Sequence, residues 1–211
     1  MGGYYASPLC AEAAAVTLSS LLISKLRTTA VRRSMSSLSS FMRNGQSRTM
    51  SLAEQERKWN SVAEHMDHFH QYFKMEYNDI YTLADGSFSK RGMSLQMYLR
   101  TAGQLVHHLT LHHTIEEKYL FPVLAKRMPA FEENDVHVRS HEAIHEGLDK
   151  LGALIRKYSS EPSLYSPQEI MACLDGWREV LFCHLDDEVK DLSAESMKKY
   201  WKLEELDTIP M

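Results

Sequence analysis

The segment from residue 107 to residue 122, HHLTLHHTIEEKYLFP, places four histidines and two glutamates among apolar side chains typical of a protein core. Imidazole nitrogens and carboxylate oxygens bind transition-metal ions, and a solvated surface has no reason to collect them. The chain has 11 histidines, and all but His184 lie between His65 and His145. These residue types predict a metal site.

From Ser51 onward the sequence has helical periodicity almost throughout, without alternating strand-like runs. Ser51 and Glu54 form a capping box, and Ser166, Pro167 and Glu169 mark another helix start. The expected helices cover about residues 51–83, 94–127, 133–158 and 166–192, followed by a short helix at about 195–203. The fold class is therefore all-α, an up-down-up-down four-helix bundle with a single apolar seam inside. Pro122 is expected to bend or break the second helix.

The buried face of each expected helix is marked by apolar residues recurring at i, i+3, i+4 and i+7. This stripe includes His70 in the first helix, His141 and His145 in the third, and His184 and Glu188 in the fourth. His137, one turn before His141, is expected near the rim. Residues four apart on a helix project from the same side, so such pairs can reach one metal centre.

The second helix contains two overlapping candidate pairs, His112 with Glu116 and His113 with Glu117. Leucines precede His112 at stripe spacing, which favours His112 and Glu116 as the inward pair. His113 and Glu117 are then expected at the rim or surface.

The predicted inward set therefore contains five histidines and two glutamates. Unpaired carboxylates in a dry seam would be costly or would have to take up a proton, and a cation removes that cost. The set is too large for one tetrahedral zinc ion, so two metal ions are expected. Two carboxylates can bridge them, while the imidazoles divide as three and two and leave one ion open to a small ligand such as dioxygen. The mixed donors suit iron, although zinc, copper, nickel and manganese remain open.

The motifs resemble those of the hemerythrin or HHE-type cation-binding domain. The resemblance covers about residues 60–192 and rests on HHTIEEKYLFP, on HEAIH in the third helix, on HLDDE in the fourth and on HQYFKMEYNDIY in the first. It implies two iron ions joined by an oxo or hydroxo group. It assigns His141, His145 and His184 to one iron, His70 and His112 to the other, and Glu116 and Glu188 as bridges.

One position departs from the respiratory members of that family, whose fourth helix has a bridging aspartate five residues after its histidine. Five residues after His184 this chain has Val189, and its carboxylate, Glu188, comes at four. The spacing resembles the broader HHE branch, whose members are implicated in sensing, metal handling and oxidative chemistry.

Three functions follow as alternatives. The first is a non-enzymatic di-iron protein that binds or senses O2, nitric oxide or iron. The second is an oxidoreductase or oxygenase that activates O2 or peroxide on a small organic substrate. The third is a structural metal site that acts through protein partners.

Residues 1–50 are expected to form a disordered or targeting tail, and residues 51–211 the bundle domain. The tail carries six basic residues against Glu12 alone, so the bundle is acidic and would repel nucleic acid. The apolar stretch at residues 13–23 is too short to span a membrane. Three widely spaced cysteines suit a reducing compartment, and the Arg- and Ser-rich start resembles a mitochondrial transit sequence. The expected location is intracellular, either cytoplasmic or mitochondrial.

Overall fold

The computed structural model describes residues 50–132 and 136–211, so the predicted tail lies outside the described residues except for Met50. Within those two ranges every regular element is helical, which confirms the all-α class. The α-helices are α1 (Leu52–Leu83), α2 (Leu95–Ile115), α3 (Phe121–Leu124), α4 (Val136–Ser160), α5 (Pro167–Asp191) and α6 (Ala194–Tyr200). None of the helices in these ranges is long and apolar enough to cross a membrane.

Serine side chains fix the starts of three long helices. The Ser51 hydroxyl accepts a hydrogen bond from the Glu54 backbone amide, and the Glu54 carboxylate accepts one from the Ser51 amide. At the starts of α2 and α5 the hydroxyls of Ser94 and Ser166 accept hydrogen bonds from the Met97 and Glu169 amides. These caps satisfy amides that have no partner within the helix, and they confirm the predicted helix starts.

The second predicted helix is interrupted one turn before Pro122. A π-helical segment, Glu116–Leu120, separates α2 from α3, and the Phe121 amide donates to the Glu116 carbonyl. Proline has no amide hydrogen and its ring clashes with the carbonyl four residues earlier, so a wider turn before Pro122 relieves the conflict. Glu116 and Leu120, at the two ends of the π-helical segment, are both buried.

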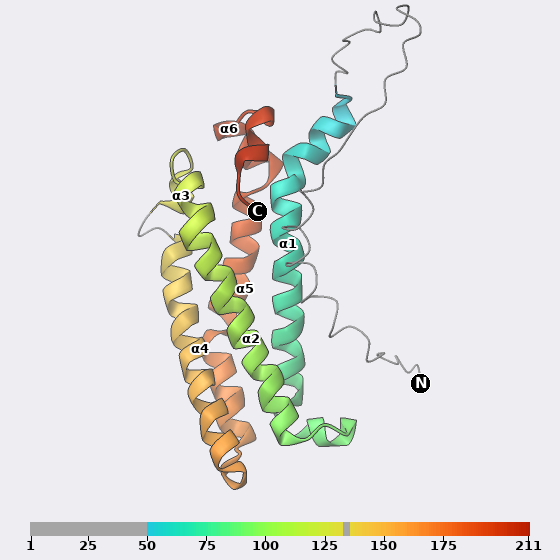
Figure 1. Cartoon of the computed structure of the whole chain (residues 1–211), viewed down its shortest axis with the longest axis vertical. Helices are drawn as coiled ribbons and strands as arrows, with labels where there is room; N and C mark the ends of the chain where they lie inside the picture. Colours follow the sequence, from blue (N-terminus) through green and yellow to red (C-terminus); the bar gives the residue numbers. More distant parts are fainter. Residues whose placement is uncertain (1–49, 133–135) are drawn as a thin grey trace, which may run out of the picture. The chain divides into compact units, whose positions relative to one another are not determined.

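The four long helices pack in a closed ring, because α1 and α4 each contact both α2 and α5 (Figure 1). Their interior has three layers. The larger apolar group includes Tyr77, Leu105, Leu148 and Leu181, and the smaller includes Met66, Leu120, Phe131 and Leu192. Between them lies the polar layer, formed by His70, His112, His113, Glu116, His141, His184 and Glu188. Each long helix therefore passes from one apolar group through the polar layer toward the other.

The end of the bundle beside the smaller apolar group is covered by the C-terminal residues. α6 and the following 3₁₀ segment, Leu203–Thr208, both pack against α1. Trp201, Leu206 and Ile209 are buried there. The predicted short C-terminal helix is confirmed as α6.

Close packing of α4 on α5 depends on Gly147. A Cβ atom at this position would lie 2.3 Å from Cγ of the buried Trp177. We expect Gly147→Ala to destabilise the protein by about 1–3 kcal/mol, because overpacking forces the core to shift. Gly176→Ala in α5 is the matched control, since its Cβ would meet nothing within 4 Å. Thermal unfolding should show a lower Tm for the first variant only, and equal shifts would contradict the packing argument.

Candidate metal centre

The polar layer brings titratable side chains from all four long helices into the dry interior. Exposed fractions are 0% for His70, His113 and Glu188, 1% for His141, 2% for Glu116 and 3% for His184, while the His112 side chain is 11% exposed. The apolar groups on both sides hold these side chains away from water. Such burial is unusual for so many polar groups unless they share a partner.

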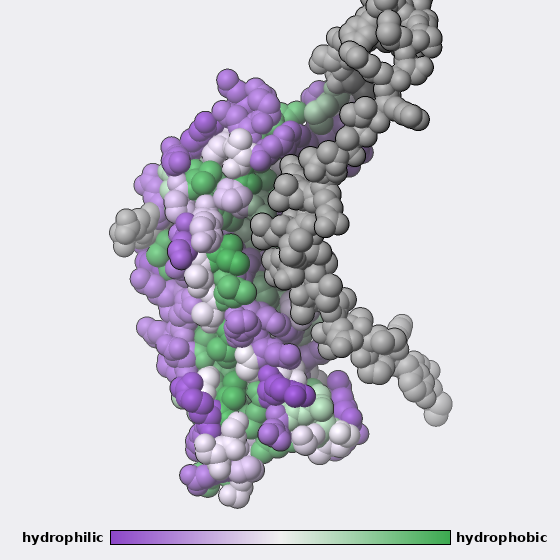
Figure 2. Space-filling model, viewed as in Figure 1, coloured by the Kyte–Doolittle hydropathy of each residue, from purple (hydrophilic) through white to green (hydrophobic). Residues whose placement is uncertain are grey.

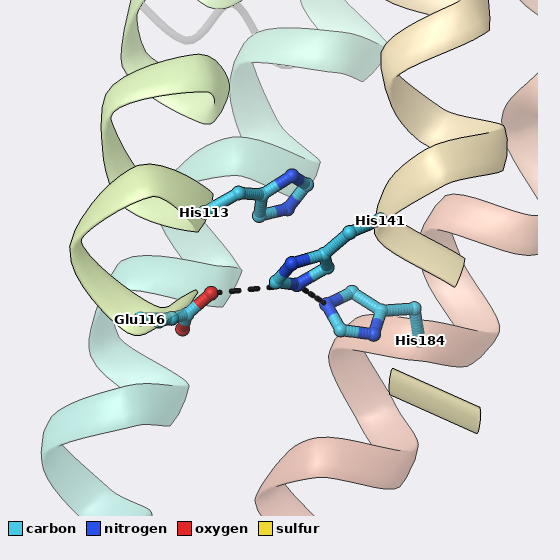
Figure 3. A group of neighbouring side chains, drawn as sticks. All are labelled: His113, Glu116, His141 and His184. Carbon is cyan, nitrogen blue, oxygen red and sulfur yellow. Dashed lines mark hydrogen bonds and ion pairs between the residues drawn. The ribbon is translucent and has the colours of Figure 1, made fainter. Parts of the chain in front are cut away.

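One cluster within the polar layer consists of His113, Glu116, His141 and His184. Each offers a donor atom within 4.8 Å of the others, and their side chains converge from α2, the π-helical segment, α4 and α5 (Figure 3). Nε2 of His141 lies 3.0 Å from Nε2 of His184 and 3.5 Å from Oε2 of Glu116. These separations suit several donors around a single cation.

A second cluster consists of His70, His112 and Glu116. Nε2 of His70 lies 3.1 Å from Nε2 of His112, which in turn lies 2.8 Å from Oε1 of Glu116. Glu188 stands between the clusters, with Oε2 at 3.6 Å from Nε2 of both His70 and His184. Both carboxylates therefore lie where they can join two ions.

Hydrogen bonds from outside the polar layer fix the tautomers of two imidazoles. Nδ1 of His70 lies 2.8 Å from the Leu185 carbonyl oxygen, and Nδ1 of His141 lies 2.8 Å from Oε1 of Glu117. Both oxygens accept, so each Nδ1 carries the hydrogen and donates. In the neutral rings Nε2 then presents a lone pair to the interior, as a metal ligand requires.

Burial controls the electrostatics of the metal-free site. Desolvation lowers the pKa of His70 and of His141 to about 3, and that of His112 to about 4. It also holds the pKa of Glu116 and of Glu188 well above the usual range for a carboxyl. The buried environment thus disfavours charge on every one of these groups, and a bound cation would reverse this preference for the carboxylates.

Unsatisfied polar atoms provide a test of whether metal ions fit. Both carboxylate oxygens of Glu116 and of Glu188 and both ring nitrogens of His113 are buried and make no hydrogen bond, although imidazole nitrogens of the polar layer lie close to the carboxylates. Buried polar atoms without partners are rare because each costs about 1–3 kcal/mol. Oxygen and imidazole donors of this kind fit one or two transition-metal ions.

Two sequence expectations about burial were wrong. His113 was expected at the rim, yet it is fully buried and its ring stacks on that of His141 with centroids 3.8 Å apart. Leu109 precedes His112 by three residues and His113 by four, and both spacings belong to the buried stripe, so the pattern allowed both histidines inside. His137, also expected at the rim, is 2% exposed, and its Nε2 lies 3.0 Å from Oδ2 of Asp191.

Six of the seven predicted ligands lie in the polar layer, and His145 does not belong to either metal-compatible cluster. Its ring is partly exposed and packs edge-on against His113, with centroids 5.3 Å apart. Glu117, expected at the rim or surface, has a side chain that is 44% exposed.

Glu117 supports the centre from outside by orienting His141. We expect Glu117→Ala to weaken metal affinity by about 10–100-fold, because the imidazole loses the acceptor that fixes its tautomer. Titration with a competing chelator measures this loss. Glu142→Ala, an exposed α4 residue beside His141, should leave affinity unchanged. Equal affinities in the two variants would show that the hydrogen bond to His141 does not matter.

Acid should destabilise the metal-free protein. The histidines of the polar layer have a pKa near 6.5 when unfolded and a lower pKa when folded, so the unfolded state binds more protons as the pH falls from about 6.5 toward 3. Glu116 and Glu188 act in the opposite sense, because their raised pKa favours the folded state at low pH and this contribution fades as the pH rises. The polar layer contains five such histidines and two such carboxylates, so the loss of stability from the histidines exceeds the gain from the carboxylates. Calorimetry on chelator-treated protein should show Tm falling below pH 6.5, and a constant Tm down to pH 4 would contradict this balance.

Comparison with known proteins relates the chain to a family and to a curated protein. A family model described as the hemerythrin HHE cation binding domain matches residues 61–194. The dimeric xanthone biosynthesis cluster protein R11 of Cryptosporiopsis sp. (strain 8999) is 32% identical over 147 residues, which cover 66% of this chain and 54% of that protein. The chain thus spans about half the length of this curated relative. No solved structure matches the chain.

Proposed function

Because the chain belongs to the hemerythrin HHE cation-binding domain family, we propose that it holds a non-heme di-iron centre that binds or senses O2, nitric oxide or iron. The observation that carries the proposal is the pair of buried carboxylates, Glu116 and Glu188, whose oxygens make no hydrogen bond and lie beside imidazole nitrogens. A cation is the partner that best satisfies them in a dry interior.

In this proposal the two ions are held by the two clusters. His113, His141 and His184 bind one ion, His70 and His112 bind the other, and Glu116 and Glu188 join them. His145 remains a proposed ligand in place of His113, as the motif resemblance implies. Two iron ions, with an oxo or hydroxo group between them, would supply reversible binding of a diatomic ligand. Other divalent metals suit the same donors.

The chain's own residues position and protect such a centre. Leu185 and Glu117 hold the hydrogens of His70 and His141 on Nδ1, so Nε2 stays free. The apolar groups above and below exclude water, which strengthens every electrostatic contact inside. The ring of helix contacts and the layer order support the predicted up-down-up-down bundle for residues 51–211.

Exposure of reduced, iron-loaded protein to O2 tests this function. A binding or sensing protein should develop a charge-transfer band in the visible region that disappears when O2 is removed. The His113→Ala variant treated in the same way provides the control for loosely bound iron. Absence of any band from fully loaded protein would overturn the proposal.

The relative's name supports a second candidate, a di-iron oxidoreductase or oxygenase that acts on a small organic substrate. That protein is named for a biosynthesis cluster, a setting in which enzymes are expected. A groove of about 710 Å³ between α2 and α4 is lined by residues that include Arg100, His107 and Ile155, but by none of the polar layer. Irreversible consumption of O2 that requires an added organic compound would favour this candidate over reversible binding.

A further inference from the structure

The polar layer approaches the surface at one of its members. Among the seven side chains only His112 is more than 3% exposed, at 11%. Its ring lies against two rings of α1, with centroids 4.8 Å from that of Phe73 and 5.9 Å from that of Phe69. Phe73 is buried, whereas Phe69 is 42% exposed. The contact between α1 and α2 is therefore where the polar layer comes nearest to solvent.

The opposite side of α2, toward α4, is closed by stacked rings. Glu117 is exposed there, but it accepts a hydrogen bond from Nδ1 of His141, the nitrogen that faces away from the polar layer. The His141 ring is itself 1% exposed and is covered by His113 at 3.8 Å between centroids. A small molecule arriving on this side would have to separate two stacked imidazoles.

We propose that ligands reach the centre between α1 and α2 at His112, and that the Phe69 ring controls their entry. This inference rests on the proposed function for its metal-dependent part. It deepens that function by naming the ligand class: neutral molecules of two or three atoms, such as O2 and nitric oxide, whereas an organic substrate would need the two helices to separate.

The surface around this entrance favours the approach of an apolar ligand. Apolar side chains gather in a band along the face that α2 crosses in Figure 2. Leu111 and Ile115, which flank His112 on α2, are 45% and 47% exposed. Phe69 packs edge-on against His65, with centroids 5.2 Å apart, so its ring has a defined resting position over His112. Desolvation at such an entrance costs little for a neutral diatomic molecule and much for an ion.

The first test uses metal-free protein and diethyl pyrocarbonate, which modifies accessible neutral imidazoles. Phe69→Ala should speed modification of His112 about tenfold, and Phe69→Trp should slow it. His107, which is exposed, and His113, which is buried, lie close to His112 in the sequence and serve as internal references for the rate of modification. Tyr200→Ala removes a ring of similar exposure, 38%, on α6 and should leave the rate unchanged. Equal rates of His112 modification in the unmodified protein and its three variants would overturn the inference and would not bear on the proposed function.

The second test measures nitric oxide binding to reduced, iron-loaded protein by stopped-flow absorbance. The association rate should rise about tenfold in Phe69→Ala and fall in Phe69→Trp, while metal content stays equal to that of the unmodified protein. Unchanged rates in proteins with full metal content would reject Phe69 as the controlling residue. Thermal unfolding of each variant shows that the fold is intact, as expected for a ring that is nearly half exposed.

Discussion

Replacing Glu116 with glutamine should remove most of the bound metal and, at the same time, stabilise the metal-free protein. Glu116 belongs to both clusters, with Oε1 at 2.8 Å from Nε2 of His112 and Oε2 at 3.5 Å from Nε2 of His141. Loss of its charge should therefore weaken the binding of both ions. Affinity should fall by more than about 100-fold, since loss of an outer hydrogen-bond partner alone costs 10–100-fold.

The opposite effect on the metal-free protein follows from the same burial. Glu116 is 2% exposed, and desolvation holds its pKa well above the usual range. A neutral amide of the same shape avoids the cost of burying a charge. We expect a gain of about 1–3 kcal/mol in the free energy of unfolding near neutral pH.

Metal analysis measures the loss of bound metal in Glu116→Gln, and calorimetry on its metal-loaded and metal-free forms measures the change in stability. Glu146→Gln, at an α4 side chain that is 77% exposed, is the control for loss of one carboxylate and should change neither quantity. A variant that binds metal normally would show that Glu116 is no ligand. A variant that loses stability with and without metal would show that its role is structural.

The second large effect concerns whether His113 or His145 is the metal ligand beside His141 and His184. His113→Ala should reduce metal content far more than His145→Ala, because only His113 lies within 4.8 Å of the donors of Glu116, His141 and His184. In the metal-free protein His113→Ala removes two buried nitrogens without partners and leaves a cavity, so its stability should change little.

Metal content after purification of both variants under identical conditions decides the choice. His107→Ala, at an exposed α2 histidine, controls for the loss of any surface imidazole. Loss of metal in His145→Ala with full retention in His113→Ala would restore the ligand set that the motif resemblance implies. It would also require the α4 side chains to turn relative to the structure described here.

Capping and periodicity predicted most of the fold from the sequence. The serine caps mark three helix starts because a side-chain oxygen at this position satisfies an amide that the helix cannot. The stripe identified His70, His184 and Glu188 correctly as buried, since each follows its apolar neighbours at regular α-helical spacing. The sequence thus predicts the features that depend on local hydrogen bonding and on a constant helical twist.

The π-helical segment shows where such reasoning ends. A period of 3.6 residues distinguishes one side of a helix from another, but it does not decide between neighbours at i+3 and i+4 when both border the core. His112 and His113 are such neighbours, and the π-helical segment that starts at Glu116, three residues after His113, ends the regular α-helical twist. The partners of the outer nitrogens, Leu185 and Glu117, depend on tertiary packing and had no local signal.

The most direct test of the proposed centre is the metal content of protein purified without added metal, measured together with its optical spectrum before and after exposure to O2. We predict that each chain binds a pair of iron ions whose near-ultraviolet and visible spectrum is that of an oxo- or hydroxo-bridged pair. A single zinc ion per chain, or no metal at all, would contradict the di-iron assignment.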